Sequence, residues 1–414
     1  YNRFMSLTSK ILIGMFSGLL LGSTISFFGL ENNQYINSYF IDGFLYIGGQ
    51  VFISLLKLMV VPLVFFSLTS GVSSLDQNLS LGRIAGKTMG LYLTTTAIAI
   101  SIGLTIAVLF NPGNNLDLET SISLSIPESP NIKDIILSII PSNPIKAMAD
   151  GNMLQIIVFS ILFGIAIRSL GDSVKLIRDS VNSITEIVLK LVMFIINIAP
   201  YGVFCLMSVL FAEKGLTVLG DLSFYFFIVV SALLLHGFLT YSLLLVLFVK
   251  VNPFKFFNKI KSLMLFAFST SSSNATIPVT LRTVVDNIGV NRKIASFTVP
   301  LGATINMDGT AIMQGVATVF IANAYSIDLL FVDYLMVILT ATLASIGTAG
   351  VPGVGLIMLA MVLNQVGLPV EGIALIIGVD RLLDMLRTVV NVTGDSTVST
   401  IVANSENQLE RTNL

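Results

Sequence analysis

The sequence has no tryptophan, one cysteine (Cys205) and one histidine (His236) among its 414 residues. A single cysteine excludes an intrachain disulfide and a thiolate metal cluster, and a single histidine excludes a metalloprotease of the HExxH type. Charged residues are also scarce, at 11% against about 25% in a soluble globular protein. Because the net charge is only −1, the chain offers no basic surface for nucleic acid.

Hydrophobic residues, by contrast, make up 54% of the chain. A helix that spans a bilayer needs about 20 largely apolar residues. The sequence therefore predicts an all-α polytopic membrane protein with eight spanning helices, at 11–30, 44–72, 88–111, 153–169, 186–211, 223–250, 294–324 and 372–403. The stretch 131–150 is less regular, and Pro141 and Pro144 predict that it forms several pieces.

Lysine and arginine in the short loops predict the orientation of the spans. The loops on the side of the amino terminus are basic, with Arg3, Lys10, Arg83, Lys87, Arg168, Lys175, Arg178, Lys250, Lys255, Lys259 and Lys261. The opposite loops are acidic, with Asp117, Glu119, Glu128, Glu213 and Asp221. We therefore expect both termini in the cytoplasm and the protein in a cell membrane, of the bacterial inner-membrane type.

One further segment, 262–281, is long enough to span but lies between two basic loops, since Arg282, Arg292 and Lys293 follow it. Its middle, 269–278, reads STSSSNATIP and is too polar to face lipid. Such a segment survives at membrane depth only inside protein or beside water. We predict a re-entrant helical hairpin that enters and leaves on the cytoplasmic side; the alternative is a kinked ordinary span.

Segment 335–370 has the same character on the opposite side. It lies between Asp328 and Asp333 at one end and Glu371 at the other, and its middle, 345–355, reads SIGTAGVPGVG. Acidic residues at both ends predict that it enters and leaves from outside. We predict a second re-entrant hairpin of opposite orientation, again with a kinked span as the alternative.

Each hairpin segment is followed by a long apolar helix that Asn, Gly and Asp interrupt, first at 302–310 and then at 391–395. The two copies of this unit begin on opposite sides of the membrane. Inverted repeats with interrupted helices are typical of secondary transporters, which bind their cargo between the repeats. We therefore expect a helix break at both places, with Met307 inside the first.

The last predicted span carries five charged residues: Asp380, Arg381, Asp384, Arg387 and Asp395. A charge at that depth costs about 2.5–3.5 kcal/mol and is normally functional. On a helix, one stripe roughly 100° wide holds Asp380, Asp384, Arg387, Thr388, Asn391 and Asp395. Arg387, with two neutral polar neighbours on this stripe, keeps donors for a ligand. For Asp380 and Arg381, a structural ion-pair ladder is the alternative.

Asp308 and Asp395 each sit beside an asparagine at an expected break. A carboxylate together with freed backbone carbonyls suits an alkali cation. Further carbonyls are expected from Thr304, Ser345, Ile346 and Thr348. A polar patch on the third span is placed to reach Asp308, although helix packing also explains it: Tyr92, Thr95 and Thr96.

Two polar residues stand alone in apolar runs. His236 has no acidic neighbour in sequence, so we expect it to pack or to hydrogen-bond between helices rather than relay protons. Lys57 lies within the second span, and its long stem allows it to snorkel.

Four motifs resemble the dicarboxylate/amino acid:cation symporter family, which includes the archaeal aspartate transporters and the animal excitatory amino acid transporters. They read SSSNATIP at 271–278, NMDGT at 306–310, GTAGVPG at 347–353 and DMLRTVVNVTGD at 384–395. The resemblance covers the whole chain. It implies eight spans, two oppositely oriented hairpins, and a homotrimer in which each protomer works alone.

The resemblance also implies a division of labour. A scaffold part would comprise 1–75 (spans one and two) and 113–220 (spans four and five). A transport part would comprise 76–112 (span three) and 221–414 (span six, both hairpins, and spans seven and eight). The transport part slides across the membrane with its cargo, as an elevator, and the second hairpin is the outer gate.

Roles carry over by position. Arg387 matches the arginine that binds the side-chain carboxylate of the substrate, and Asp384 matches the acceptor for its amino group. Asn391 and Ser273 match binders of the α-carboxylate. Thr310 and Thr388 match polar neighbours of the substrate. Val351 and Gly355 match backbone contacts from the second hairpin.

Sodium ligands carry over as three sets, with no organic cofactor implied. The first comprises Gly302, Asn306, Asn391 and Asp395. The second, made of carbonyls, comprises Thr304, Ser345, Ile346 and Thr348. The third comprises Tyr92, Thr95, Thr96, Asn306 and Asp308.

The chain departs from the animal members at Gln314, where proton- and potassium-coupled relatives carry glutamate. It departs from the archaeal pattern at Ser271, where an arginine is expected.

The sequence thus predicts a sodium-coupled symporter that takes up L-aspartate or L-glutamate through a lipid bilayer, with the choice of amino acid left open. The main alternative is a proton-coupled symporter of glutamate or C4-dicarboxylates. A channel is a second alternative, but a stripe of Asp and Arg suits a stoichiometric site better than a pore. An intramembrane aspartyl protease is a third, but 392–395 reads VTGD and lacks the expected GxGD.

Overall fold

The computed structural model describes residues 7–73, 79–114, 116, 118, 140–348 and 350–410. These residues are helical almost throughout, and the one β pairing among them is an isolated bridge between Val290 and Leu409. The expected all-α class agrees with this architecture. Some residues of the charge pattern lie outside the described residues: Arg3, Asp117, Glu119 and Glu128.

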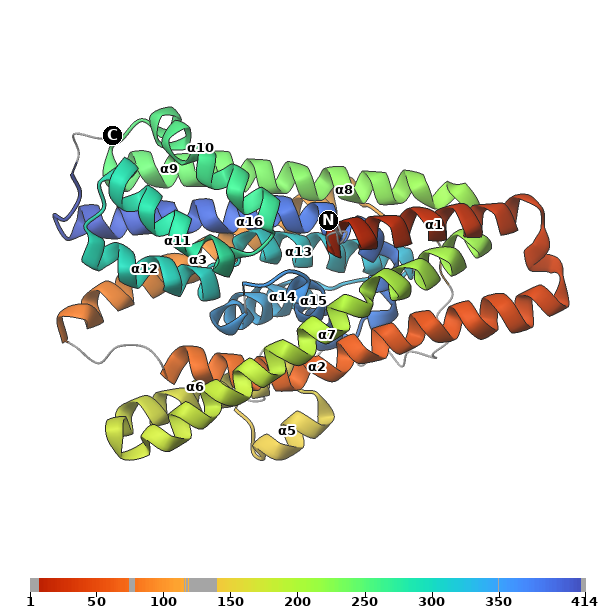
Figure 1. Cartoon of the computed structure of the whole chain (residues 1–414), viewed down its shortest axis with the longest axis horizontal. Helices are drawn as coiled ribbons and strands as arrows, with labels where there is room; N and C mark the ends of the chain where they lie inside the picture. The colour runs from red at the N-terminus through yellow and green to blue at the C-terminus, as the bar shows by residue number, and fades with distance from the viewer. Residues whose placement is uncertain are drawn as a thin grey trace, which may run out of the picture.

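One group of helices packs around α7 (Lys175–Lys214), which crosses α1 (Leu7–Phe27) and α2 (Tyr46–Ser73). Along α2 lies α6 (Met153–Leu170), and Figure 1 shows α2, α6 and α7 together at one side of the molecule. Small residues allow the close approach of α1 and α7, because a Cβ on Gly14, Gly18 or Gly22 would overlap a carbonyl oxygen of α7.

Short elements connect this group: η1 (Leu30–Asn32), η2 (Ile36–Leu45), α5 (Pro144–Asp150), η3 (Gly171–Val174) and η4 (Gly215–Thr217). The helix α5 is separated from α6 at Gly151, which adopts a left-handed conformation. Of the stretch 131–150, residues 131–139 lie outside the described residues, so its division into several pieces stays a prediction.

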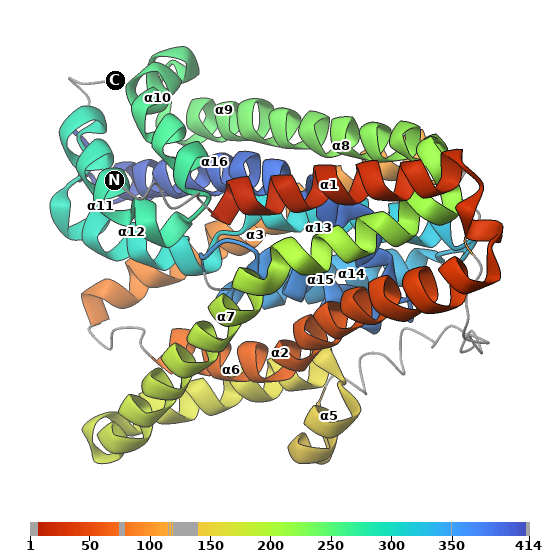
Figure 2. The same cartoon turned by 45° about the vertical axis from the view of Figure 1, so that its right-hand side comes forward.

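A second group surrounds α16 (Ile373–Ser405), the central helix of the molecule. It contacts α3 (Leu79–Phe110), α8 (Val218–Leu234), α12 (Arg292–Ile305) and α13 (Asp308–Ala324). Figure 2 shows α8 and α9 running along α16 on the side away from α2 and α6. The helix α8 continues through η5 (Leu235–Thr240), α9 (Tyr241–Leu244) and η6 (Leu245–Val249).

Helix–turn–helix pairs occupy both segments for which we predict re-entrant hairpins. In the first, α10 (Pro253–Thr270) and α11 (Ser273–Arg282) pack together, and η7 (Thr283–Ile288) extends α11. In the second, α14 (Phe331–Ala344) leads through η8 (Ser345–Gly347) into α15 (Val354–Gln365). The element η9 (Val370–Gly372) then precedes α16. The two turns form the tips of the hairpins, and both face the interior of the fold.

Five helices among the described residues are long and apolar enough to cross a membrane: Ser9–Phe27, Ile36–Ser73, Arg83–Phe110, Gln155–Lys214 and Val218–Val249. The fourth of these joins two predicted spans, at 153–169 and 186–211. Two more predicted spans fall outside this set. The span 294–324 is interrupted between α12 and α13, and the span 372–403 carries the charged residues of α16.

The predicted break at 302–310 is confirmed, since α12 ends at Ile305 and α13 begins at Asp308. The predicted break at 391–395 is wrong, because α16 runs without interruption through it. The glycine in that motif has another use: a Cβ on Gly394 would overlap the Asn306 amide and the Tyr241 hydroxyl. Gly394 therefore lets two polar side chains approach an intact helix.

Candidate functional site

Two arginines and two aspartates of α16 form a buried ion-pair cluster. Arg387, whose side chain is 1% exposed, donates from Nη1 to Asp380 Oδ1 at 2.7 Å and from Nη2 to Asp384 Oδ1 at 2.8 Å. Arg381 Nη1 lies 3.3 Å from Asp384 Oδ2. The opposite charges balance, which offsets part of the cost of burying them.

This cluster corrects the expectation that Arg387 lies among neutral neighbours. Thr388 donates to the backbone oxygen of Asp384, and the Asn391 side chain accepts from Gly309 N–H. The partners of the Arg387 guanidinium are therefore the carboxylates of Asp380 and Asp384, not the side chains of Thr388 and Asn391. Its Nε nevertheless remains buried with no hydrogen-bond partner among the described residues, so one donor is left for a ligand.

The second hairpin reaches this cluster. Gly353 N–H donates to Asp384 Oδ2 at 3.3 Å, and a Cβ on Gly355 would lie 3.2 Å from Arg387 Nη2. A cavity of about 40 Å³ lies between α16, the second hairpin and helices α1, α2 and α7, and Asp380, Arg381 and Asp384 line its polar side. It has room for only a few water molecules.

The tip of the first hairpin donates two hydrogen bonds to one carbonyl at the tip of the second. The Gly350 carbonyl accepts from Ser272 Oγ at 2.7 Å and from Asn274 N–H at 3.1 Å. Two polar atoms beside this contact, Ser271 Oγ and Asn274 Oδ1, are buried with no partner among the described residues. Two candidate substrate residues lie at the tips in sequence: Ser273 begins α11 and Val351 follows Gly350. A third, Thr310, lies apart from them in the first turn of α13.

The first candidate cation set is brought together. Asn306 donates from Nδ2 to Asp395 Oδ1 and to the Asn391 carbonyl, both at 2.9 Å. A Cβ on Gly302 would overlap Asp395 Oδ1, so that backbone lies directly against the carboxylate. Asn391 also donates to Met307 Sδ at 3.4 Å, which places the methionine of the α12–α13 break at the same site. All of these residues are buried.

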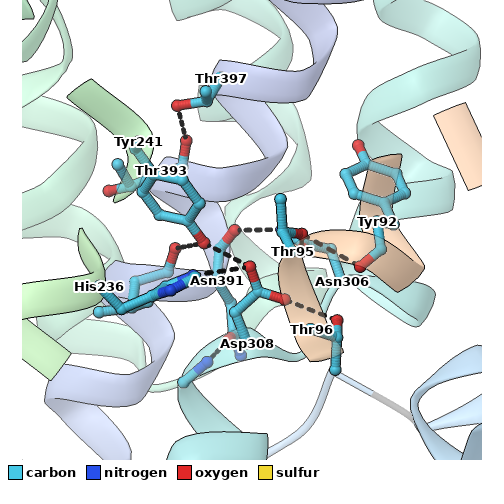
Figure 3. A network of polar contacts seen from close by, with 12 residues as sticks. Tyr92, Thr95, Thr96, His236, Tyr241, Asn306, Asp308, Asn391, Thr393 and Thr397 are labelled. Carbon is cyan, nitrogen blue, oxygen red and sulfur yellow. Dashed lines mark hydrogen bonds and ion pairs between the residues drawn. The ribbon is translucent and has the colours of Figure 1, made fainter. Parts of the chain in front are cut away.

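The third candidate set centres on Asp308, which is fully buried (Figure 3). Thr96 donates to Asp308 Oδ1 at 2.6 Å, as expected from the sequence. The three remaining members lie nearby: Thr95 donates to Asn306 Oδ1 at 3.5 Å, and Tyr92 donates to the Thr298 carbonyl at 3.0 Å.

Two partners of Asp308 were missed by sequence reasoning. His236 Nε2 lies 3.0 Å from Asp308 Oδ2, and the Tyr241 hydroxyl donates to the same oxygen at 2.8 Å. His236 thus forms an interhelical hydrogen bond, as expected, but with an acidic residue far away in sequence. These contacts are only weakly indicated in the sequence, by one histidine and one tyrosine five residues apart in an apolar run.

The second candidate set lies where η8 packs against α12. Each of its hydroxyls donates to a carbonyl within its own turn, from Thr304 to Leu301, from Ser345 to Thr342 and from Thr348 to Ala344. The hydroxyl groups are therefore engaged locally, and it stays a prediction that this set, including Ile346, offers carbonyl oxygens to a cation.

Lys57 forms an ion pair at the end of its long, partly exposed side chain. Its Nζ lies 2.7 Å from Glu371 Oε1, so the side chain links α2 to η9 at the start of α16. Partial burial raises the pKa of the Glu371 carboxyl, but the hydrogen bonds from Lys57 and from its own backbone outweigh this, and the pKa lies below its usual range.

An all-helical fold with long apolar helices, and with a charged site buried where two helical hairpins meet, defines a helical membrane transporter. The model of the sodium:dicarboxylate symporter family matches residues 7–405, nearly the whole chain. The chain belongs to this family. Because the family consists of transporters, the protease alternative is set aside.

Three relatives illustrate the range of the family. The chain is 34% identical to the proton/glutamate-aspartate symporter of Escherichia coli, over 99% of this chain and 95% of that protein. It is 32% identical to the proton/sodium-glutamate symport protein of Geobacillus stearothermophilus, over 98% of this chain and 96% of that protein. It is 35% identical to the mouse excitatory amino acid transporter 2, over 84% of this chain and 71% of that protein.

Proposed function

We propose that this protein is a sodium-coupled symporter of L-aspartate or L-glutamate. Sodium is a co-transported cargo, and it binds where the buried carboxylates of Asp308 and Asp395 lie. The names of the Geobacillus and mouse relatives, and the description of the family, support this choice of cargo.

One observation carries the proposal. Asp308 and Asp395 are buried among amide, hydroxyl and imidazole groups, and within the described part of the chain neither forms an ion pair with a lysine or arginine. A buried carboxylate without a compensating cation is costly. An alkali cation held by these carboxylates and by the neighbouring carbonyls supplies the missing charge.

The Asp380–Arg381–Asp384–Arg387 cluster supports an acidic amino acid as the substrate. An amino acid with a side-chain carboxylate would replace the ion pairs within this cluster, because it carries both a carboxylate for an arginine and an ammonium group for an aspartate. Its side-chain carboxylate binds the Arg387 guanidinium, with which it can form two parallel hydrogen bonds. Its ammonium group binds Asp384, and its α-carboxylate binds Asn391 and Ser273. Specificity then follows from opposite charges placed a fixed distance apart.

The packing of the helices supports an elevator. The helices packed with α7 would form a fixed scaffold that holds a homotrimer, and those around α16, with both hairpins, would carry the cargo. The same proposal includes eight spans and two re-entrant hairpins, with both termini in the cytoplasm. Because the cavity beside Asp384 is too small for an amino acid, the second hairpin would open to admit it.

A proton-coupled symporter of glutamate or C4-dicarboxylates is the second candidate, and the name of the E. coli relative favours it. The residue at position 314 argues against it. Gln314 is buried on α13, where the animal pattern has glutamate, and its amide has no proton to exchange in this pH range.

The two candidates are separated by uptake into proteoliposomes with sodium, proton and potassium gradients imposed one at a time. We expect labelled aspartate or glutamate to accumulate under an inward sodium gradient alone. Accumulation under an inward proton gradient in the absence of sodium would replace the proposal with the second candidate. Serine and succinate, added in excess as competitors, test the substrate class, and neither should reduce uptake.

A further inference from the structure

Asp308 receives hydrogen bonds from two sides of the fold. Thr96 on α3 donates to Oδ1, whereas His236 and Tyr241, on the helix that continues α8, both contact Oδ2 (Figure 3). Thr96 belongs to the candidate cation set. His236 and Tyr241 lie outside every candidate set, yet both are fully buried.

A local change of helix type brings these two side chains together. On a regular α-helix, residues five apart point about 140° away from each other. Here η5 (Leu235–Thr240) is a π-helical turn, in which the hydrogen bonds connect residues five apart. His236 and Tyr241 therefore face the same way, with ring centroids 4.8 Å apart.

The direction of each hydrogen bond follows from the acceptor. A carboxylate only accepts, so the Tyr241 hydroxyl donates and the Nε2 atom of His236 carries the proton. The other ring nitrogen, Nδ1, is buried with no partner among the described residues. The imidazole thus directs its single satisfied contact at Asp308.

We infer that His236 and Tyr241 are positioning residues for the binding of sodium at Asp308, an inference that rests on the proposed function. They hold Oδ2 from one side and so fix the plane of the carboxylate. Oδ1, beside the Thr96 hydroxyl, is thereby turned toward the cation. Groups that orient a metal ligand in this way typically contribute 10- to 100-fold to metal affinity.

The π-helical turn has a function in this arrangement. Without it, only one of the two side chains would reach Asp308, and Oδ2 would be held by a single donor. Gly394 also contributes, since its missing side chain leaves room for the Tyr241 hydroxyl. The Tyr241 hydroxyl also lies 3.3 Å from the Val390 carbonyl, which ties the same group to α16.

The test measures binding of labelled substrate to the purified full-length protein as a function of sodium concentration. Tyr241→Phe keeps the ring and removes only the hydroxyl, and His236→Leu removes the imidazole donor. We expect each to raise the half-saturating sodium concentration about tenfold or more, and to leave substrate affinity at saturating sodium near that of the unmodified protein. His236→Gln retains an N–H at nearly the same reach and should restore most of the sodium affinity.

Tyr225→Phe is the matched control. Tyr225 lies on α8, is equally buried, and has a hydroxyl with no partner among the described residues. Its replacement should leave the sodium dependence within twofold of the unmodified protein. If Tyr225→Phe shifts the sodium dependence as much as Tyr241→Phe, loosened packing accounts for both, and the inference is overturned.

A double-mutant cycle with Asp308→Asn separates the inference from the proposed function. If Asp308→Asn leaves the sodium dependence unchanged, the proposed sodium site is wrong. If Asp308→Asn weakens sodium binding but Tyr241→Phe and His236→Leu stay within twofold, only the inference is overturned. The inference requires that Tyr241→Phe adds no further effect once Asp308 is replaced, and Asp308→Ala serves in its place if Asp308→Asn does not fold. A full additional effect in that background would overturn it.

Discussion

Arg381 Nη1 lies 3.3 Å from Asp384 Oδ2, one helical turn away on α16. Asp384 is consequently held from two sides, because Arg387 binds its Oδ1 at 2.8 Å. The two guanidinium groups bind different oxygens of one carboxylate, and the substrate ammonium is proposed to bind the same carboxylate.

Arg381→Ala should weaken substrate binding about tenfold, since a hydrogen bond to a charged group contributes about 1.5–3 kcal/mol. Without Arg381, Asp384 pairs more fully with Arg387, and the substrate must break that stronger pair. Isothermal titration with aspartate or glutamate at saturating sodium measures the change. Arg381→Lys keeps the charge and should recover part of the affinity. Binding as tight as in the unmodified protein would mean that Arg381 has no part in preparing the site.

Arg387→Cys should decide the substrate class. The change removes the partner of the side-chain carboxylate, and losing one partner of a buried charge pair costs about 2–5 kcal/mol, so aspartate and glutamate should bind at least about 30-fold more weakly. Serine or alanine should bind in their place, because the groups proposed for the amino acid backbone remain. Competition binding with all four amino acids measures this. Arg282→Cys, on the exposed end of α11, is the control, and aspartate binding within a few-fold of normal would contradict the assignment.

Asp395→Asn should reduce the steepness with which substrate affinity depends on sodium. The substitution keeps the shape of the side chain but removes the charge beside Asn306 and Gly302, and sodium and substrate share a coupling free energy. Substrate affinity measured across a series of sodium concentrations gives the slope. Asp286→Asn, in an exposed ion pair with Arg282, should leave the slope as it was. The same slope in Asp395→Asn would argue against a cation at this position.

The Lys57–Glu371 pair joins the proposed scaffold to the proposed transport part, so it should stabilise the arrangement seen in this structure. Both side chains are partly exposed, and such a pair contributes about 0.2–1 kcal/mol. Glu371→Gln should therefore shift the balance between arrangements by up to about fivefold. Spin-label distances between α2 and α15 measure the shift. Asp172→Asn, which breaks a pair inside the scaffold helices, is the matched control and should shift nothing.

The same pair has a defined pH dependence. Because the pKa of Glu371 is lowered below its ordinary value of 4.5, its contribution is fully present above that value and is lost as the pH falls through the lowered pKa. Spin-label distances should therefore be constant near neutral pH and should change only in acid, below about pH 4.5. A transition at higher pH that Glu371→Gln abolishes would contradict this.

Local patterns in the sequence predicted much of the fold. Loop charges located both hairpin segments, and helical periodicity placed Asp380, Asp384 and Arg387 on one buried stripe, because both signals need only neighbouring residues. The contacts of Lys57 and His236 were beyond reach, since their partners lie 314 and 72 residues away. The two Asn–Gly–Asp motifs differ in outcome for a similar reason. A motif of Asn, Gly and Asp looks the same in sequence whether the helix ends within it, as at Ile305, or continues through it, as at Gly394, where the glycine admits neighbouring side chains.

The Gly350 carbonyl of the second hairpin accepts two hydrogen bonds from the first hairpin, so moving either hairpin away costs the free energy of both bonds. When either tip withdraws, the Ser272 hydroxyl and the Asn274 N–H lose their common partner at once, and both donors must then find water or cargo. The first stage of opening is therefore expensive unless solvent or an amino acid is ready to replace that carbonyl. In the proposed sodium-coupled symporter, an empty carrier that opens reluctantly would let few sodium ions cross alone, so this single backbone oxygen would favour tight stoichiometry over leakage.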